Sequence, residues 1–407
     1  MNLLQSKWGR TLLFTCLYFS EGAPIGFIWW ALPTLLREQD VAVSDITALT
    51  ALLVLPWALK FLWAPLVDTL RSRRNGFRHW IMGCQLMMGV TLLPVVFLEP
   101  ATDFSQLKIL LLLHALSAST QDVAVDALAI KVTKAQDRGL LNGCMQAGML
   151  LGRSLFGGGA LVLVSLMGWA GILIGLTVCT WLSILILCLI EEPVSSRPPR
   201  VEFQSHLYAA VKERTTWWGL AFALISAAAF EATGAIGGPF LLDRQLPREA
   251  IGFFFAVPAV IATLVGGIAG GRISDRFGRI TSVTVSLFGF VIIVAGLGVI
   301  DGMLAGNAPQ ATLISLLTAL YLFIGAFTTS SYALFMDLTD PDLGATQFSA
   351  FMAATNGCEA WSGWLAGQLV TWSGYSGCFF VMSFISLSSL SLLGFLAHRN
   401  FAVPRET

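Results

Sequence analysis

Charged residues are scarce in this sequence. Asp, Glu, Lys and Arg make up 12% of the 407 residues, against roughly 25% in a typical soluble domain. The 24 acidic and 24 basic residues balance, so the formal net charge is zero, and no polybasic surface indicates nucleic acid as a partner. The composition therefore excludes a soluble globular domain and points to a protein embedded in a membrane.

Metal-site and signal-peptide patterns are also missing. The seven cysteines lie in apolar stretches without CxxC pairs or metal-ligand spacing, so we interpret them as buried small hydrophobic residues and predict no metal and no cofactor. Lys7 and Arg10 precede an apolar run, but Glu21 interrupts it and no convincing small-residue cleavage site follows. We therefore interpret this run as an uncleaved first span.

Long apolar runs make up most of the chain. Hydrophobic residues account for 56% of it and the mean hydropathy is +0.76. At about 20 residues per crossing, the sequence predicts an all-α membrane protein with twelve transmembrane helices. The predicted spans are 11–36, 45–67, 80–98, 107–130, 140–165, 168–190, 216–241, 249–271, 280–300, 310–336, 346–371 and 375–397.

These spans predict two pseudo-symmetric six-helix bundles. The N-terminal bundle covers 1–190 and the C-terminal bundle covers 215–407. Between them, 191–214 is the longest polar stretch, and its prolines and charges are typical of a linker. Duplicated six-span halves are the layout of a secondary transporter with its site at the midplane of the membrane.

The positive charges predict the orientation. Eighteen Lys and Arg residues fall in segments that face the cytoplasm if the N-terminus lies inside, and four face outward: Arg37, Lys108, Arg244 and Arg248. This bias places both termini in the cytoplasm. The short chain favours a bacterial inner membrane, where we expect a multi-pass monomer in the lipid bilayer.

Two aspartates lie inside the fourth apolar span. Asp122 and Asp126 are four residues apart, so they share one helix face, and His114 lies about two turns away on the same face. A carboxylate in hydrocarbon costs about 2.5–3.5 kcal/mol and normally marks a pathway or a relay. We favour function for Asp122, whereas for Asp126 a packing ion pair near Lys131 is an equal alternative. For the lone His114, packing is the more common role.

Lys60 is the natural partner of one of these acids. At about 1.5 Å per residue, Lys60 lies about 12 Å from Asp68 and Asp122 about 13 Å from Lys131, so the two lie at matching depths and predict an ion pair. The pair is either purely architectural or a switch that competes with a proton or a substrate charge; we favour the switch.

A further glutamate lies near mid-bilayer. Glu21 has no cation close in sequence, and burial favours its protonated form, as a proton carrier requires. Alternatively, it is permanently protonated and bonds a carbonyl beside the Pro24 bend. Glu231 has the same two interpretations in the second half. We predict proton coupling at Glu21, Asp122 and Glu231, and a substrate cavity that includes Lys60, Asp126, His114, Gln121, Trp29 and Trp30.

Other charges suggest gates between the halves. An aspartate at a cytoplasmic helix end beside loop arginines can lock neighbouring helices. The predicted gating residues are Asp68, Arg71, Asp275, Arg276, Arg279, Arg153, Glu359 and Asp337. GxxxG spacings, such as Gly148 to Gly152, predict that spans 5, 8 and 11 are crowded.

Two groups of residues resemble a known family. Gly271 to Arg279 resembles the G-x-x-x-D-R-x-G-R loop of the major facilitator superfamily. Lys60-Phe-Leu-Trp-Ala-Pro-Leu-Val-Asp68 and Gln121-Asp-Val-Ala-Val-Asp126 resemble motifs shared by AmpG-type muropeptide permeases, acetyl-coenzyme A transporters and siderophore importers of the rhizobactin and pyochelin type. The resemblance implies the superfamily fold, import of a small molecule, and a cavity lined by spans 1, 4, 7 and 10.

The cargo is predicted less directly. AmpG permeases tend to carry extra spans, so the compact chain is more like the siderophore importers. The excess of buried carboxylates disfavours a polyanionic cargo, and the aromatic residues fit a medium-sized amphipathic solute. We expect a proton-coupled importer of a siderophore, with a muropeptide as the alternative.

Two alternatives belong to other classes of protein. A membrane acyltransferase using His114 and Asp122 is disfavoured, because the chain has no nucleophile elbow and no large polar loop. A non-transporting sensor of the same fold is the other alternative. We therefore predict that the chain is not an enzyme.

Overall fold

The computed structural model describes residues 2–69, 76–134, 137–192, 213–339 and 344–400. Their regular structure is helical, and no strand occurs within these ranges. The first half contains α1 (Lys7–Gly26), α2 (Leu32–Glu38), α3 (Val43–Leu59), α4 (Ala64–Thr69), α5 (Gly76–Leu92), α6 (Phe104–Val132), α7 (Arg138–Arg153) and α8 (Gly159–Cys188). The second half contains α10 (Arg214–Ile225), α11 (Ala228–Asp243), α12 (Arg248–Ala256), α13 (Pro258–Phe277), α14 (Arg279–Met303), α15 (Gln310–Leu338), α16 (Gly344–Ser388) and α17 (Leu390–Asn400).

These helices confirm the prediction of twelve spans. Nine helical stretches of the described chain are long and apolar enough to cross a membrane. Two of these, Leu140–Cys188 and Gln347–Leu396, are about twice the length of one crossing. Each turns at a glycine with positive φ, Gly168 (φ 68°) and Gly374 (φ 70°), a conformation that side chains rarely adopt. The twelfth span is the 29-residue α6, which carries charged side chains along its length.

The described chain divides into two compact units. The first unit contains Met1–Val41, Leu59–Arg197 and Pro247–Val257; the second contains Ala42–Ala58, Pro198–Leu246 and Pro258–Thr407. Each unit is built mainly from one half of the sequence and takes one helical segment from the other half. The predicted division at residues 190 and 215 stays a prediction, and most of the linker 191–214 lies outside the described residues.

The passages from one unit to the other coincide with breaks in helices. α3 ends at Leu59, and the 3-10 turn Lys60–Leu62 follows. Val257 separates α12 from α13 with φ −124° and ψ −68°, because the ring of Pro258 disfavours helical geometry in the residue before it.

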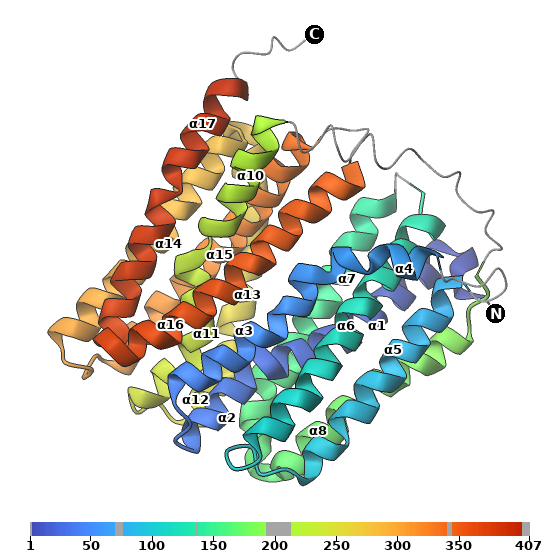
Figure 1. The fold of residues 1–407 in the computed structure, drawn as a ribbon, viewed down its shortest axis with the longest axis horizontal. Helices are drawn as coiled ribbons and strands as arrows, with labels where there is room; N and C mark the ends of the chain where they lie inside the picture. The colour runs from blue at the N-terminus through green and yellow to red at the C-terminus, as the bar shows by residue number, and fades with distance from the viewer. Residues whose placement is uncertain (1, 70–75, 135–136, 193–212, 340–343, 401–407) are drawn as a thin grey trace. The chain divides into compact units, whose positions relative to one another are not determined.

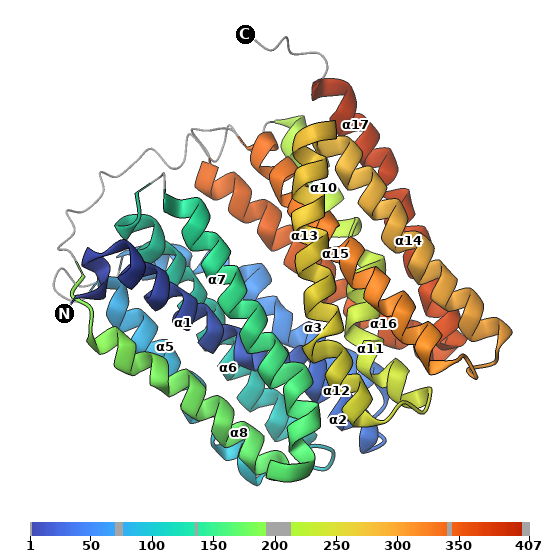
Figure 2. The same ribbon diagram turned by 180° about the vertical axis from the view of Figure 1, so that it is seen from behind.

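Within the first unit, α1 and α7 approach each other closely through glycines. Figure 1 and Figure 2 show the two helices running side by side. A Cβ added at Gly26 would lie 2.5 Å from Cα of Arg153, and one at Gly152 would lie 2.7 Å from the backbone nitrogen of Ala23. No side chain fits at such distances, so the predicted crowding of span 5 is confirmed.

The second unit uses glycine in the same way. A Cβ added at Gly270 of α13 would lie 2.5 Å from Cα of Ala326 in α15. Gly367 of α16 packs directly on Ser44 and Thr47 of α3. Spans 8 and 11 are therefore crowded, as the glycine spacing predicts.

A polar cluster closes one end of the second unit. Arg244 donates from Nε to Oδ1 of Asp301 at 2.5 Å, and Ser376 donates to the other oxygen of Asp301 at 2.8 Å. Tyr375 donates to Asp243 at 2.8 Å, and the Arg244 guanidinium lies 5.2 Å from the centre of the Tyr375 ring. These contacts join the ends of α11 and α14 to the turn at Gly374 within α16.

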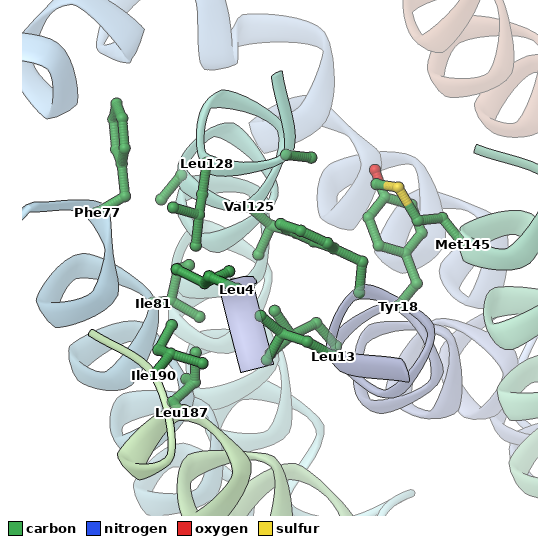
Figure 3. Close-up of a cluster of buried hydrophobic side chains, with 14 of the residues drawn as sticks. Leu4, Leu13, Tyr18, Phe77, Ile81, Val125, Leu128, Met145, Leu187 and Ile190 are labelled. Atoms are coloured by element: carbon green, nitrogen blue, oxygen red, sulfur yellow. The ribbon is translucent and has the colours of Figure 1, made fainter. Parts of the chain in front are cut away.

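An apolar cluster holds α6 inside the first unit. Figure 3 shows it, with side chains from the 3-10 turn Leu3–Gln5, from α1, α5, α6, α7 and α8, and from Ile190 just after α8. Its labelled members are Leu4, Leu13, Tyr18, Phe77, Ile81, Val125, Leu128, Met145, Leu187 and Ile190. Tyr18 and Val125 belong to this cluster, so it sets how α1 and α6 face each other at the residues described next.

Candidate functional site

Polar side chains gather inside the first unit where α1, α6 and the 3-10 turn Lys60–Leu62 meet. The turn follows Pro56 of α3, and α1 contains Pro24, so both chain segments depart from regular helix near this point. α6 stays helical throughout and presents Gln121, Asp122 and Asp126 from one continuous rod. Rigid helices and short breaks thus position the charged groups.

Lys60 and Asp122 form the predicted ion pair. Nζ of Lys60 donates to Oδ2 of Asp122 in a short contact. The Lys60 side chain is 26% exposed and that of Asp122 is 10% exposed. Nearby, Trp63 donates from Nε1 to Oγ1 of Thr120 at 3.1 Å. The 3-10 turn and the residue after it are therefore attached to α6 at two points.

Asp126 is bound by a residue that the sequence did not indicate. The hydroxyl of Tyr18 donates to Oδ1 of Asp126 at 2.5 Å, while Lys131 forms an ion pair with Glu192 at 2.8 Å. Tyr18 precedes Glu21 by three residues on α1, so the two share a helix face. This spacing was the only signal that could have identified Tyr18.

Glu21 is buried among these charges. It is 1% exposed, and its Oε2 has no hydrogen-bond partner in the part of the chain that the structure describes. Asp122, Asp126, Lys60 and Arg153 lie within electrostatic reach of it. Three carboxyl groups therefore share this region with two cations, and adding one proton balances the charge.

Two other predicted cavity residues differ in their surroundings. Gln121 is fully buried, and neither its amide nitrogen nor its amide oxygen has a partner among the described residues. His114 is also fully buried and faces α5, where its Nδ1 lies 3.1 Å from the carbonyl oxygen of Met88. The contact of His114 fits the packing interpretation, whereas Gln121 keeps a donor and an acceptor available.

Trp29 and Trp30 lie in a π-helical turn, Phe27–Ala31, that follows Pro24. Trp30 stacks on Phe255 of α12, with ring centres 5.4 Å apart. A single π-helical turn within an α-helix often marks a functional site.

A second π-helical turn, Ser154–Gly158, packs against the first and against α12. Ser154 donates from its hydroxyl to the carbonyl of Ala256 at 2.6 Å. Arg248 at the start of α12 forms an ion pair with Glu38 at 2.9 Å.

The predicted gating residues of the second half form a small network. Nη1 of Arg279 contacts Asp275 at 2.5 Å, and its Nε contacts Asp337 at 3.2 Å. The Arg276 guanidinium lies 5.3 Å from the centre of the Phe277 ring. Arg279 therefore joins the end of α13 to the end of α15.

The corresponding residues of the first half are not described to this extent. Arg71 lies outside the described residues, and Asp68 is described only as part of the α4 backbone.

The remaining predicted charges are divided between the units. Arg153 ends α7 in the first unit, and its Nε has no hydrogen-bond partner among the described residues. Glu231 of α11 and Glu359 of α16 belong to the second unit, and both lie within electrostatic reach of Cys358. Gating and proton coupling at these positions stay predictions.

Known proteins resemble this chain over most of its length. A protein named putative transporter AmpG 4 from Rickettsia conorii is 25% identical, covering 92% of this chain and 94% of that protein. The anhydromuropeptide permease of Escherichia coli K12 is 26% identical, covering 90% of this chain and 75% of the permease. The AmpG-type resemblance seen in the motifs is thereby confirmed.

Solved structures share the fold. The D-xylose-proton symporter superposes with a TM-score of 0.74 at 13% identity, covering 94% of this chain and 96% of that one. The nucleoside transporter NupG superposes with a TM-score of 0.72 at 14% identity, covering 95% and 99%. At such low identity these neighbours show the arrangement of helices and not the cargo.

The family model described as the Major Facilitator Superfamily matches residues 14–358. This match covers the site on α1 and α6 and most of both halves, and it agrees with the twelve spans and with the solved neighbours. The chain is therefore a multi-pass membrane protein that belongs to the Major Facilitator Superfamily of transporters.

Proposed function

We propose that this protein is a proton-coupled importer of anhydromuropeptides, working by alternating access in a bacterial inner membrane with both termini in the cytoplasm. The observation that carries the proposal is the Lys60–Asp122 ion pair beside the buried Glu21, inside a chain that aligns with an anhydromuropeptide permease over nine-tenths of its length.

The charges around Lys60 support coupling between cargo and proton. Lys60 lies within electrostatic reach of Asp122, Asp126 and Glu21, and a cargo carboxylate would compete with them for its Nζ. Once Asp122 accepts a proton it no longer holds Lys60 by charge, so Lys60 becomes available to an acidic cargo. Muropeptides carry carboxylates in their peptide portion, and Lys60 matches that chemistry.

The buried acidic groups also limit how much negative charge the cargo can carry. With Lys60 and Arg153 as the cations near Glu21, the site suits a solute with one or two negative charges better than a polyanion such as a coenzyme A ester.

The expectation of a siderophore remains an untested prediction. It was based on the compact length of the chain, but the Rickettsia proteins named as AmpG transporters match this chain over 94% of their own length. Length therefore does not separate the two kinds of cargo, and the named relatives favour the muropeptide.

Uptake into proteoliposomes tests the proposal. We expect radiolabelled anhydromuropeptide to accumulate when the outside is more acidic than the inside, and accumulation to stop when the gradient is collapsed. A ferric siderophore is measured in parallel. Accumulation of the siderophore and not of the anhydromuropeptide would overturn the proposed cargo, and uptake that ignores the gradient would overturn proton coupling.

A deletion strain provides the matching test in cells. Loss of the importer should release anhydromuropeptides into the growth medium and leave growth on ferric siderophores under iron limitation unchanged. The reverse pattern would assign the protein to iron uptake.

A further inference from the structure

One hydrogen bond joins α1 directly to the acidic face of α6. The Tyr18 hydroxyl donates to Oδ1 of Asp126 at 2.5 Å, across 108 positions of sequence. Tyr18 is 6% exposed, and its ring belongs to the apolar cluster with Leu13, Val125 and Met145 (Figure 3). Packing therefore fixes the position of the ring, and the hydroxyl is directed at Asp126.

The position of Asp126 makes this hydrogen bond important for the pairing of Lys60. Asp122 and Asp126 are one helical turn apart on α6, and both lie within electrostatic reach of Lys60. Among the described residues, the ammonium group of Lys60 donates its hydrogen bond to Asp122. Because Tyr18 supplies a donor to Asp126, that carboxylate is satisfied without Lys60.

The surroundings of Asp126 include few other charges. The charged groups that face it are Asp122 on its own helix, Lys60 on the 3-10 turn and Glu21 on α1. From α5, which also packs on α6, Arg78 is directed elsewhere and donates to the carbonyl of Ile190 at 2.9 Å. Tyr18 is thus the hydrogen-bond donor that decides how Asp126 is held.

We propose that Tyr18 is a positioning residue of the coupling site: its hydroxyl holds Asp126 so that Lys60 pairs with Asp122 alone, and it links the helix that carries Glu21 to the helix that carries both aspartates. This inference rests on the proposed function. Tyr18 acts through Asp126 and touches neither the cargo nor the transferred proton.

The link responds to the proton. A hydrogen bond to an ionised carboxylate is roughly twice as strong as one to a neutral acid. When Asp126 is ionised, α1 and α6 are held together at this point. When Asp126 is protonated the bond weakens, and at this point α1 and α6 are held mainly by the packing of the apolar cluster. Proton binding at the acidic face is thereby connected to movement of α1.

The substitution Tyr18→Phe tests the proposal, because it keeps the packed ring and removes only the hydroxyl. Tyr375→Phe is the matched control: Tyr375 is equally buried at 6% exposed and donates to Asp243 at 2.8 Å in the second unit. Both variants are reconstituted at full length, and infrared difference spectra recorded against pH measure the protonation of buried carboxyl groups without any cargo.

In Tyr18→Phe we expect one carboxyl midpoint to move upward by about one pH unit, because a carboxylate that loses a donor holds a proton more readily. Asp126→Asn should remove that transition, and the double variant Tyr18→Phe/Asp126→Asn should behave as Asp126→Asn does. Tyr375→Phe should leave this midpoint in place.

Transport separates this inference from the proposed function. With anhydromuropeptide in proteoliposomes, we expect Tyr18→Phe to lower gradient-driven accumulation at least tenfold and to shift the pH profile of exchange. A spectral shift in a protein that does not transport anhydromuropeptide would support the positioning role and overturn the cargo. Wild-type transport with an unchanged midpoint and pH profile in Tyr18→Phe would overturn the positioning role alone. Should Tyr18→Phe not fold, persistence of the carboxyl transition in Asp126→Asn would overturn the positioning role as well, because the transition would then belong to another group.

Discussion

Removing the charge of Lys60 or of Asp122 alone should destabilise the protein more than removing both charges together. Breaking a buried pair by deleting one partner costs about 3–5 kcal/mol, because the other charge is left buried without compensation. The Lys60 side chain is 26% exposed and that of Asp122 is 10% exposed, so water screens part of this cost. We expect about 3 kcal/mol for Lys60→Ala and about the same for Asp122→Ala.

The double variant should be less unstable than the sum of the single variants. Without either charge, only the lost packing remains, and we expect about 2 kcal/mol for Lys60→Ala/Asp122→Ala instead of about 6. Reversible unfolding in lipid-detergent mixtures, followed by tryptophan fluorescence, measures all three free energies. Additivity within about 0.5 kcal/mol would refute the energetic coupling of the pair.

A second buried pair serves as the control for function. Arg244 and Asp301 lie 2.5 Å apart with side chains 17% and 5% exposed, but they join helix ends of the second unit. Arg244→Ala should cost stability of the same order without changing the pH dependence of uptake. An equal change of pH dependence in both pairs would mean that Lys60 and Asp122 act only through stability.

Three further substitutions have distinct expected outcomes. Glu21→Gln should abolish accumulation driven by a pH gradient and leave folding and cargo exchange intact, because it removes the buried acid; gradient-driven uptake at the wild-type rate would exclude Glu21 as the coupling site. Gly152→Leu should prevent the close contact of α1 with α7 and destabilise the protein by about 3 kcal/mol or more in thermal unfolding, whereas Gly143→Ala, with nothing within 4 Å of an added Cβ, should be close to neutral. Asp275→Asn should slow the exchange between facing states more than it weakens cargo binding, because it removes one of the two acidic contacts of Arg279; stopped-flow fluorescence and equilibrium binding distinguish the two effects.

The spans and the Lys60–Asp122 pair were predictable from the sequence. Apolar runs of about 20 residues determine where a chain crosses the bilayer, because lipid leaves backbone groups no partner outside the helix. The fixed rise of a helix then places Lys60 and Asp122 at the same depth. Glycine spacing predicted for a similarly local reason that span 5 is crowded, because small residues one turn apart leave a groove on that helix. That α1 fills this groove is a finding of the structure.

Other features were decided only by tertiary structure. Tyr18 and Asp126 are 108 positions apart in the sequence. The spacing of residues along one helix does not determine how that helix is rotated against its neighbour. That rotation follows from the packing of an apolar cluster to which α1, α4, α5, α6, α7 and α8 of the first unit all contribute. Likewise, the stacking of Trp30 on Phe255 and the ion pair of Arg248 with Glu38 depend on α12 joining the first unit.

The sequence by itself determined which groups are buried in the membrane and at what depth, because hydrophobicity and helical rise are local properties. The tertiary structure decided which of those groups meet, because side-chain contacts between helices depend on how all of them pack.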